Sequence, residues 1–249
     1  LTGRRSHDGH GHAHCRVLGS GDLERDGELQ FMRLLPSARN PKVGGILLSR
    51  EIKEAQLPTK AMTVEAWVQI DRSIEWGGIL GAVHDTGTHE RGWILGYGNN
   101  QFYFGLVAEK PARITYLRAS GKFVTGTWYH VAASYDGNEM RLYVDGQLSA
   151  QHVGQSGPIL QSESPFFTIG AYRDDNDYYP FTGKLERITL WHRALPAEEL
   201  AKRFAKRKDE FPGIEDAVVA RTGGPSDWTT WMGDNARSGR AGEALPALS

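Results

Sequence analysis

Hydrophobic and polar residues alternate along much of this chain, and the alternation is clearest at residues 62–71. Met62 and every second residue up to Ile70 are apolar, and most residues between them are polar. Period-two alternation predicts a β-strand with one buried face. Further apolar runs predict strands at 15–18, 29–32, 45–48, 78–83, 93–97, 101–107, 113–117, 128–135, 140–144, 147–150, 166–170 and 183–191. The pattern therefore predicts ten to thirteen strands and an all-β fold.

Turn signals separate several of these runs. Two Asp-Gly pairs, at 136–137 and 145–146, flank the run 140–144, and an Asn pair lies at 99–100. Gly and Asn tolerate the positive φ angles of tight hairpin turns, so these positions predict antiparallel hairpins. In the predicted strand 183–191 the apolar residues break the period-two alternation, and a β-bulge at 186–187 would restore it.

One helix is predicted after the last strand. It starts near Pro196, because proline lacks an N–H that is not needed at a first helical position. Glu198 and Glu199 lie in the first turn and basic residues 206–208 in the last, which suits the helix dipole. Strands followed by one terminal helix predict a two-sheet antiparallel sandwich with one short C-terminal helix.

The composition narrows the classes of function. The 249 residues are enough for one large domain or two small ones. Lys and Arg number 29 and Asp and Glu number 30, and this net charge of -1 gives no basis for nucleic-acid binding. No run approaches the roughly 20 apolar residues of a membrane span. The single cysteine, Cys15, excludes an internal disulfide.

Four segments carry a family resemblance: MTVEAWVQID, GTWYHVAASYDGNEMRLYVDGQL, FFTIGAYR and FTGKLERITLWHRALPAEEL. Together, over roughly residues 60–203, they resemble the laminin-G-like branch of the concanavalin A-like lectin/glucanase superfamily. The resemblance implies a jelly-roll domain over residues 1–208. It also implies a recognition or spacer module of an exported protein, which is periplasmic, at the cell surface or extracellular.

The tail carries a second, shorter resemblance. SDWTTWMGDNARSGR, residues 226–240, is similar to the lead-in to a PQQ-like β-propeller. Glycines and prolines between 212 and 225 are typical of a linker. We therefore expect residues 209–249 to be a linker and the start of a further domain of the same parent chain. The missing initiator Met fits a segment of a longer, multidomain protein.

A histidine-rich segment near the start is the first candidate metal site. Imidazole and thiolate groups bind Zn²⁺, Cu and Ni, although the spacing here matches no defined zinc motif. The alternative is a polar segment whose composition happens to be rich in histidine. The candidate ligands are His7, His10, His12, His14 and Cys15.

An acidic loop is the candidate calcium site. Ca²⁺ takes six to eight oxygen ligands, and Asp174, Asp175 and Asp177 supply carboxylates within four residues. The family resemblance adds Glu186, at a position where members commonly place an Asp that helps to hold calcium. Here Arg187 follows it, and an early N-D-Y segment of the family is missing. The alternative is a solvated loop at the rim of the sandwich.

Four aromatic residues are the candidate ligand-binding residues, because they fall outside the inferred core register or in loops. Aromatic rings stack on the apolar faces of sugars, so a sheet that bears them could bind a glycan. The alternative is ordinary packing in a second layer of the structure. These residues are Trp67, Trp76, Tyr103 and Tyr143.

Catalytic motifs are missing from the sequence. Glycosidases of the superfamily usually place their carboxylates in an E-x-D-x-x-E pattern, which does not occur in this sequence, and the same-face neighbours of Glu65 are Trp67 and Gln69. His130 and His152 are expected to have structural roles. The sequence thus predicts a non-catalytic module that binds a glycan or a protein surface, with calcium as its one expected cofactor. A structural spacer without a small ligand is the alternative, and a divergent glycoside hydrolase is the least favoured hypothesis.

Overall fold

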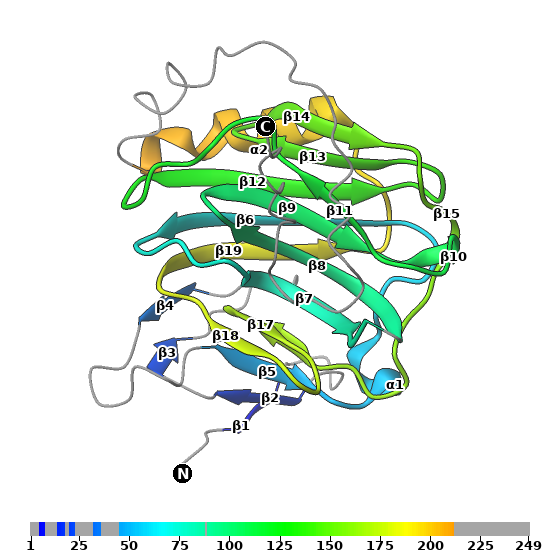
Figure 1. Cartoon of the computed structure of the whole chain (residues 1–249). Helices are drawn as coiled ribbons and strands as arrows, with labels where there is room; N and C mark the ends of the chain where they lie inside the picture. The colour runs from blue at the N-terminus through cyan, green and yellow to red at the C-terminus, as the bar shows by residue number, and fades with distance from the viewer. Residues whose placement is uncertain are drawn as a thin grey trace, which may run out of the picture.

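The computed structural model describes residues 5–7, 14–17, 20–22, 32–35, 45–87 and 89–211. Two large antiparallel sheets face each other and form a jelly-roll sandwich (Figure 1). The eight-stranded sheet contains, in spatial order, β1 (Arg5–His7), β2 (His14–Val17), β5 (Ile46–Ser49), β16 (Phe167–Ile169), β7 (Gly77–Asp85), β8 (Glu90–Gly98), β9 (Gln101–Leu106) and β11 (Thr115–Arg118).

The second large sheet has seven strands. In spatial order they are β14 (Gln147–His152), β13 (Met140–Val144), β12 (Trp128–Tyr135), β6 (Met62–Ile70), β19 (Gly183–Trp191), β4 (Met32–Leu35) and β3 (Ser20–Asp22). Two small pairs join β10 (Ala108–Lys110) to β15 (Ser156–Ile159), and β17 (Ala171–Arg173) to β18 (Tyr178–Pro180). The helices are α1 (Ile52–Ala55), α2 (Ala197–Arg207) and the 3₁₀ turn η1 (Lys208–Glu210).

The main core lies between the two large sheets. The alternating apolar residues of β6 point into it, and Met62, Val64 and Val68 have no exposed surface. They share one cluster with residues of the facing sheet such as Trp93 and Phe104. The period-two pattern therefore identified the inner face of the sandwich.

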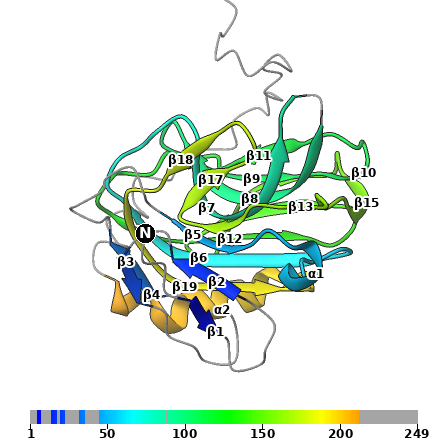
Figure 2. The ribbon, with the colours of Figure 1, turned by 90° about the horizontal axis from the view of Figure 1, so that it is seen from below.

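The other face of β6 is buried as well, so the prediction of one buried face was wrong for this strand. Thr63, Glu65 and Trp67 point away from the core and yet are at most 4% exposed. Helix α2 causes this burial, because it lies along the outer side of the seven-stranded sheet (Figure 2). A strand pattern cannot reveal such a second layer.

The predicted turns are confirmed. Asn99 and Asn100 have φ angles of 52° and 63°, and Asp145 has 48°. The predicted bulge in β19 is also present. The pairing of β19 with β6 shifts register between Glu186 and Thr189, where Arg187 has a φ of 50°.

The number of strands differs from the prediction, whereas the helix starts near Pro196 as predicted. The described residues form 19 strands, and many of the additional ones are only three or four residues long. Three residues are too few to show a period, which explains why the β17–β18 pair was missed. Helix α2 begins at Ala197, with Pro196 as its N-cap. Within the described part of the chain, no helix has the length and apolar character needed to cross a membrane.

Candidate functional site

The outer face of the eight-stranded sheet carries a cluster of aromatic rings, which we call the tyrosine face. Glycines on β8 and β9 leave room for rings to lie on the backbone. A Cβ at Gly96 would lie 2.5 Å from Cζ of Tyr103, and a Cβ at Gly105 would lie 2.9 Å from Cε1 of Tyr116. The high glycine content of these strands therefore allows two tyrosines to lie flat across the sheet.

Trp76, just before β7, lies at the centre of the tyrosine face. Its ring centroid is 5.1 Å from that of Tyr116, 5.8 Å from Tyr103 and 6.0 Å from Tyr172. Tyr172 in turn lies 5.9 Å from Tyr179 of β18. These are ordinary separations for tilted aromatic pairs. Strands from distant parts of the chain thus bring five rings together.

Three aspartates border this cluster, and each accepts a hydrogen bond from a tyrosine hydroxyl. The donor–acceptor distances are 2.8 Å for Tyr116 to Asp85, 3.4 Å for Tyr172 to Asp174, and 3.2 Å for Tyr179 to Asp177. The pairs are not equally accessible. Tyr116, Tyr179 and Asp177 are half-buried, whereas Tyr172, Asp85 and Asp174 are buried.

Burial shifts the pKa of two ionisable groups of the tyrosine face, Asp174 and Arg118. Burial raises the pKa of Asp174 to about 6, even though the backbone amides of Asp177 and Asn176 donate to its carboxylate. Asp177 and Asp85 add to the rise by repulsion. Burial also lowers the pKa of the Arg118 guanidinium, which lies 5.8 Å from the Trp76 ring centroid. The tyrosine face therefore combines apolar rings with carboxylates and a cation.

The structure divides the four predicted aromatic residues between the two sheets. Trp76 and Tyr103 belong to the tyrosine face, with exposed fractions of 7% and 0%. Trp67 and Tyr143 lie on the outer side of the seven-stranded sheet, each 2% exposed. Their contact with a glycan stays a prediction.

The more accessible rings of the tyrosine face were not predicted. Tyr116 and Tyr179 are both half-buried, and each donates to an aspartate. The only sequence signal for Tyr116 is its place at period two with Arg118 in a short strand. Tyr179 lies in a three-residue strand, which gives no pattern. Tertiary packing brings these side chains together.

Helix α2 covers the aromatic residues of the seven-stranded sheet. The Trp67 ring stacks on Phe211, with centroids 4.1 Å apart and planes at 10°, and on Phe204 at 5.8 Å. Tyr143 packs with the buried Leu195 and Leu200. The predicted helix is therefore a lid over this sheet.

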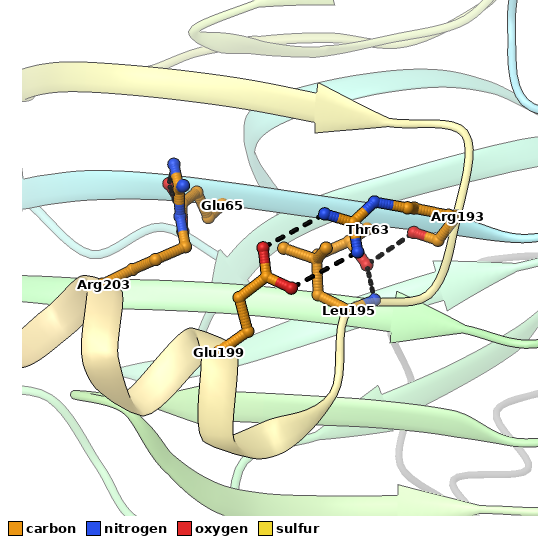
Figure 3. Close-up of polar contacts among 6 residues, drawn as sticks. All are labelled: Thr63, Glu65, Arg193, Leu195, Glu199 and Arg203. Atoms are coloured by element: carbon orange, nitrogen blue, oxygen red, sulfur yellow. Dashed lines mark hydrogen bonds and ion pairs between the residues drawn. The ribbon is translucent and has the colours of Figure 1, made fainter.

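A largely buried ionic network holds α2 against the seven-stranded sheet, and Figure 3 shows two of its members, Glu65 and Arg203. The Glu65 carboxylate accepts hydrogen bonds from Nε and Nη2 of Arg203 at 3.0 and 2.6 Å, and Nε2 of His130 lies 3.2 Å from it. Burial alone would raise the pKa of Glu65. The hydrogen bonds and charges of His130 and Arg203 outweigh that effect and hold the pKa below its usual value.

The start of α2 is held by a second contact with β6. The Thr63 hydroxyl donates to the backbone oxygen of Arg193 at 2.9 Å and accepts from the Leu195 amide at 2.8 Å (Figure 3). The Arg193 side chain forms an exposed ion pair with Glu199. Thr63 and Glu65 therefore hold the two ends of the helix from the same face of one strand.

The structure places the candidate calcium ligands on two different sheets. Asp174, Asp175 and Asp177 lie in the turn between β17 and β18, above the eight-stranded sheet. Glu186 lies on β19 of the other sheet, opposite Trp67. Among the described residues, no group of three or more His, Cys, Asp and Glu side chains is arranged to hold a metal ion. Calcium binding stays a prediction.

Part of the histidine-rich segment is described as backbone. In the β1–β2 pair His7 lies directly opposite His14, and Ser6 lies opposite Cys15. His10 and His12 lie outside the described residues. Transition-metal binding by this segment also stays a prediction, as do the linker and further domain expected in 209–249, of which the structure describes residues 209–211.

A family model described as the concanavalin A-like lectin/glucanases superfamily matches residues 49–201. The chain belongs to this superfamily. The match begins at the last residue of β5 and ends within α2, so Arg203 and Phe211 lie beyond it. The laminin-G-like resemblance and the predicted jelly roll are thus confirmed.

Several known proteins are similar to this superfamily member. Pappalysin-1 of Mus musculus is 25% identical over 169 residues, which are 62% of this chain and 10% of the pappalysin. The chain thus spans about a tenth of the length of this curated relative. Among solved structures, the binding domain of botulinum neurotoxin serotype G has a TM-score of 0.54 at 15% identity. The alignment covers 80% of this chain and 47% of the toxin domain.

A sialidase from Trypanosoma rangeli has the same TM-score of 0.54, at 20% identity. The alignment covers 83% of this chain and 32% of the sialidase. At identities of 15% and 20%, these structural neighbours show that the chain shares their fold. They do not assign an activity to the chain.

Proposed function

We propose that this chain is a non-catalytic recognition module that binds a carbohydrate on the tyrosine face. The observation that carries the proposal is the set of three tyrosine–aspartate pairs around Trp76. Ring faces pack against the C–H groups of a sugar, and carboxylate oxygens accept its hydroxyl protons. The half-buried Tyr116 and Tyr179 are the rings that a ligand reaches first.

The comparisons support this proposal at the level of the fold. The superfamily is named for lectins and glucanases, and the toxin neighbours are binding domains. A further structural neighbour, with a TM-score of 0.53, is from botulinum neurotoxin type C, whose cell entry depends on interaction with two ganglioside molecules. The missing E-x-D-x-x-E pattern favours binding over hydrolysis. We also infer export, because the laminin-G-like modules that this sequence resembles are usually exported.

A glycan array tests the proposal, followed by titration calorimetry with any sugar that binds. We expect Tyr116→Ala and Tyr179→Ala each to weaken binding at least tenfold. Tyr143→Phe, on the other sheet, is the matched control and should bind as the wild type does. Circular dichroism checks that each variant is folded. A folded wild-type chain that binds no sugar would support the spacer alternative, and release of reducing sugar would support the hydrolase.

We also propose that Ca²⁺ binds the turn between β17 and β18 and stabilises the folded chain. It is supported by the three aspartates of that turn and by the family resemblance. A ligand that binds only the native state raises the unfolding temperature as its concentration rises. Millimolar Ca²⁺ should therefore raise this temperature for the wild type and have less effect on Asp175→Asn. An equal response to Mg²⁺ and to Ca²⁺ in both proteins would contradict the proposal.

A further inference from the structure

Two arginines lie on one phenylalanine ring beside the ends of two neighbouring strands, β5 and β16, of the eight-stranded sheet. The guanidinium carbon of Arg50 is 3.5 Å from the centroid of the Phe166 ring, and that of Arg173 is 4.7 Å from it. The two positive charges are therefore no more than about 8 Å apart, which is within one Debye length at physiological salt. Such an arrangement is unfavourable unless an anion lies nearby.

The fold brings these residues together from three segments. Arg50 directly follows β5, and Phe166 directly precedes β16, which pairs with β5. Arg173 ends β17, which follows β16 in the chain and packs against β7. Tyr178, opposite Arg173 in the β17–β18 pair, places a second ring 5.1 Å from the Arg173 guanidinium. Two rings thus hold Arg173 in a fixed position.

No carboxylate of the described residues pairs with either arginine, although acidic residues are close in sequence. Asp175 lies 3.5 Å from His84, and Asp177 accepts from Tyr179. The Nε atom of Arg173 is buried and has no hydrogen-bond partner in the described part of the chain. A buried donor without an acceptor is costly, so an acceptor from outside the fold would stabilise this arrangement.

Stacking also leaves the arginines able to bind. A guanidinium that stacks on a ring uses its flat face, while its N–H groups point outward along the edges of its plane. These edges form a fork that matches the oxygens of a carboxylate or sulfate. Phe166 is 7% exposed and provides a rigid floor between the two cations.

We propose that Arg50, Phe166 and Arg173 form a binding site for an oxyanion, either a free inorganic anion or the carboxylate of an acidic sugar. The guanidinium of Arg173, whose Nε lacks a partner among the described residues, holds one side of the anion, and the guanidinium of the exposed Arg50 holds the other side. The site is distinct from the tyrosine face, so it does not depend on the function proposed above.

NMR of the arginine side chains tests this site directly. The Nε–H signal of Arg173 should shift saturably when sodium sulfate is added at constant ionic strength. Arg50→Gln should weaken this binding at least tenfold without changing the fold, because Arg50 is exposed. Arg193→Gln, which removes a guanidinium already paired with Glu199, is the matched control and should leave it unchanged. Absence of a saturable shift, or equal affinity in Arg50→Gln, would overturn the proposal.

The source of the anion is distinguished by further titrations. Glucuronate and acetate carry the same carboxylate, and glucose is the neutral counterpart of the sugar. Tighter binding of glucuronate than of acetate assigns the site to an acidic sugar, and equal binding assigns it to a free anion. Glucose should not shift the Arg173 signal. If glucose shifts it as glucuronate does, the charge of the ligand is irrelevant and the oxyanion site is wrong.

Discussion

The carboxylate of Glu65 accepts a bidentate hydrogen bond from the guanidinium of Arg203, across 138 residues of sequence. Glu65 belongs to the EAWV segment, and Arg203 lies on α2, whose first residues are the AEEL of RALPAEEL. His130, in the WYHVA segment, completes the network. Two of the segments that carry the family resemblance therefore meet the helix that a third segment begins, which gives them a structural role in holding α2.

Arg203→Ala should destabilise the fold strongly. It leaves the Glu65 carboxylate, 5% exposed, without its main partner. Removing one member of a buried pair costs several kcal/mol. We expect roughly 2–4 kcal/mol in the free energy of unfolding, because the Arg203 side chain itself is 34% exposed. Arg193→Ala breaks an exposed pair between the segment before α2 and Glu199 of that helix, and it should cost no more than about 1 kcal/mol. Equal costs in urea denaturation would contradict the lid role of Glu65.

The Glu65 pair should also make stability depend on pH. Since the folded-state pKa of Glu65 lies below the unfolded value of 4.5, the ionised pair adds stability above pH 4.5. This contribution is lost as the pH falls through the folded-state pKa. The difference in unfolding free energy between wild type and Glu65→Gln should therefore shrink below pH 4.5. Denaturation curves between pH 3 and 7 measure it, and a constant difference would rule the mechanism out.

Phe211→Ala should loosen the end of the lid. Phe211 is 5% exposed and lies against the rings of Trp67 and Trp128. Loss of a buried phenylalanine near the end of an element should cost about 2–4 kcal/mol. It should also shift tryptophan emission to longer wavelength, because water reaches Trp67. Val124→Ala, at a site that is 55% exposed, is the control and should change neither measurement by much.

Much of this fold could be predicted from the sequence. The strand at 62–70, the turn at Asp145-Gly146 and the bulge at Arg187 are local features, since a period or a positive φ is set by neighbouring residues. Burial of Glu65 and Trp67 could not be predicted in this way. It depends on where α2 packs, and the helix pattern does not state which sheet it covers.

The candidate sites were less predictable for the same reason. The tyrosine face combines side chains of β9, β11, β17 and β18 with Trp76, and no sequence spacing links them. The calcium hypothesis named Glu186 or the 174–177 loop as the site, and the structure places these positions in different layers of the sandwich. Sequence identifies the types of side chain that are present, and packing decides which of them meet.

Alanine substitutions at two glycines with positive φ distinguish the cost of backbone strain from the cost of a clash with α2. Gly146 has a φ of +72° and Gly126 one of +78°. A Cβ at Gly126 meets nothing within 4 Å, whereas a Cβ at Gly146 would lie 3.0 Å from Cβ of Phe204 on α2. Gly126→Ala should cost about 1–2 kcal/mol from the backbone alone. Gly146→Ala should cost more in thermal or urea unfolding, and equal costs would show that α2 does not press on this turn.

Asp174→Asn tests the electrostatics of the tyrosine face. Its folded-state pKa of about 6 lies above the unfolded value of 3.8, so the fold favours the protonated carboxyl. The stability that this group contributes is therefore fully present below pH 3.8 and is lost as the pH rises through about 6. Asparagine stays neutral and keeps an oxygen for the amides of Asn176 and Asp177. The variant should thus be more stable than the wild type above pH 6, by about 1–3 kcal/mol, and equal to it at pH 3.5. The exposed Asp71, changed to Asn, is the matched control in the same denaturation series. A gain that is the same at both pH values would show that Asp174 is not protonated in the fold.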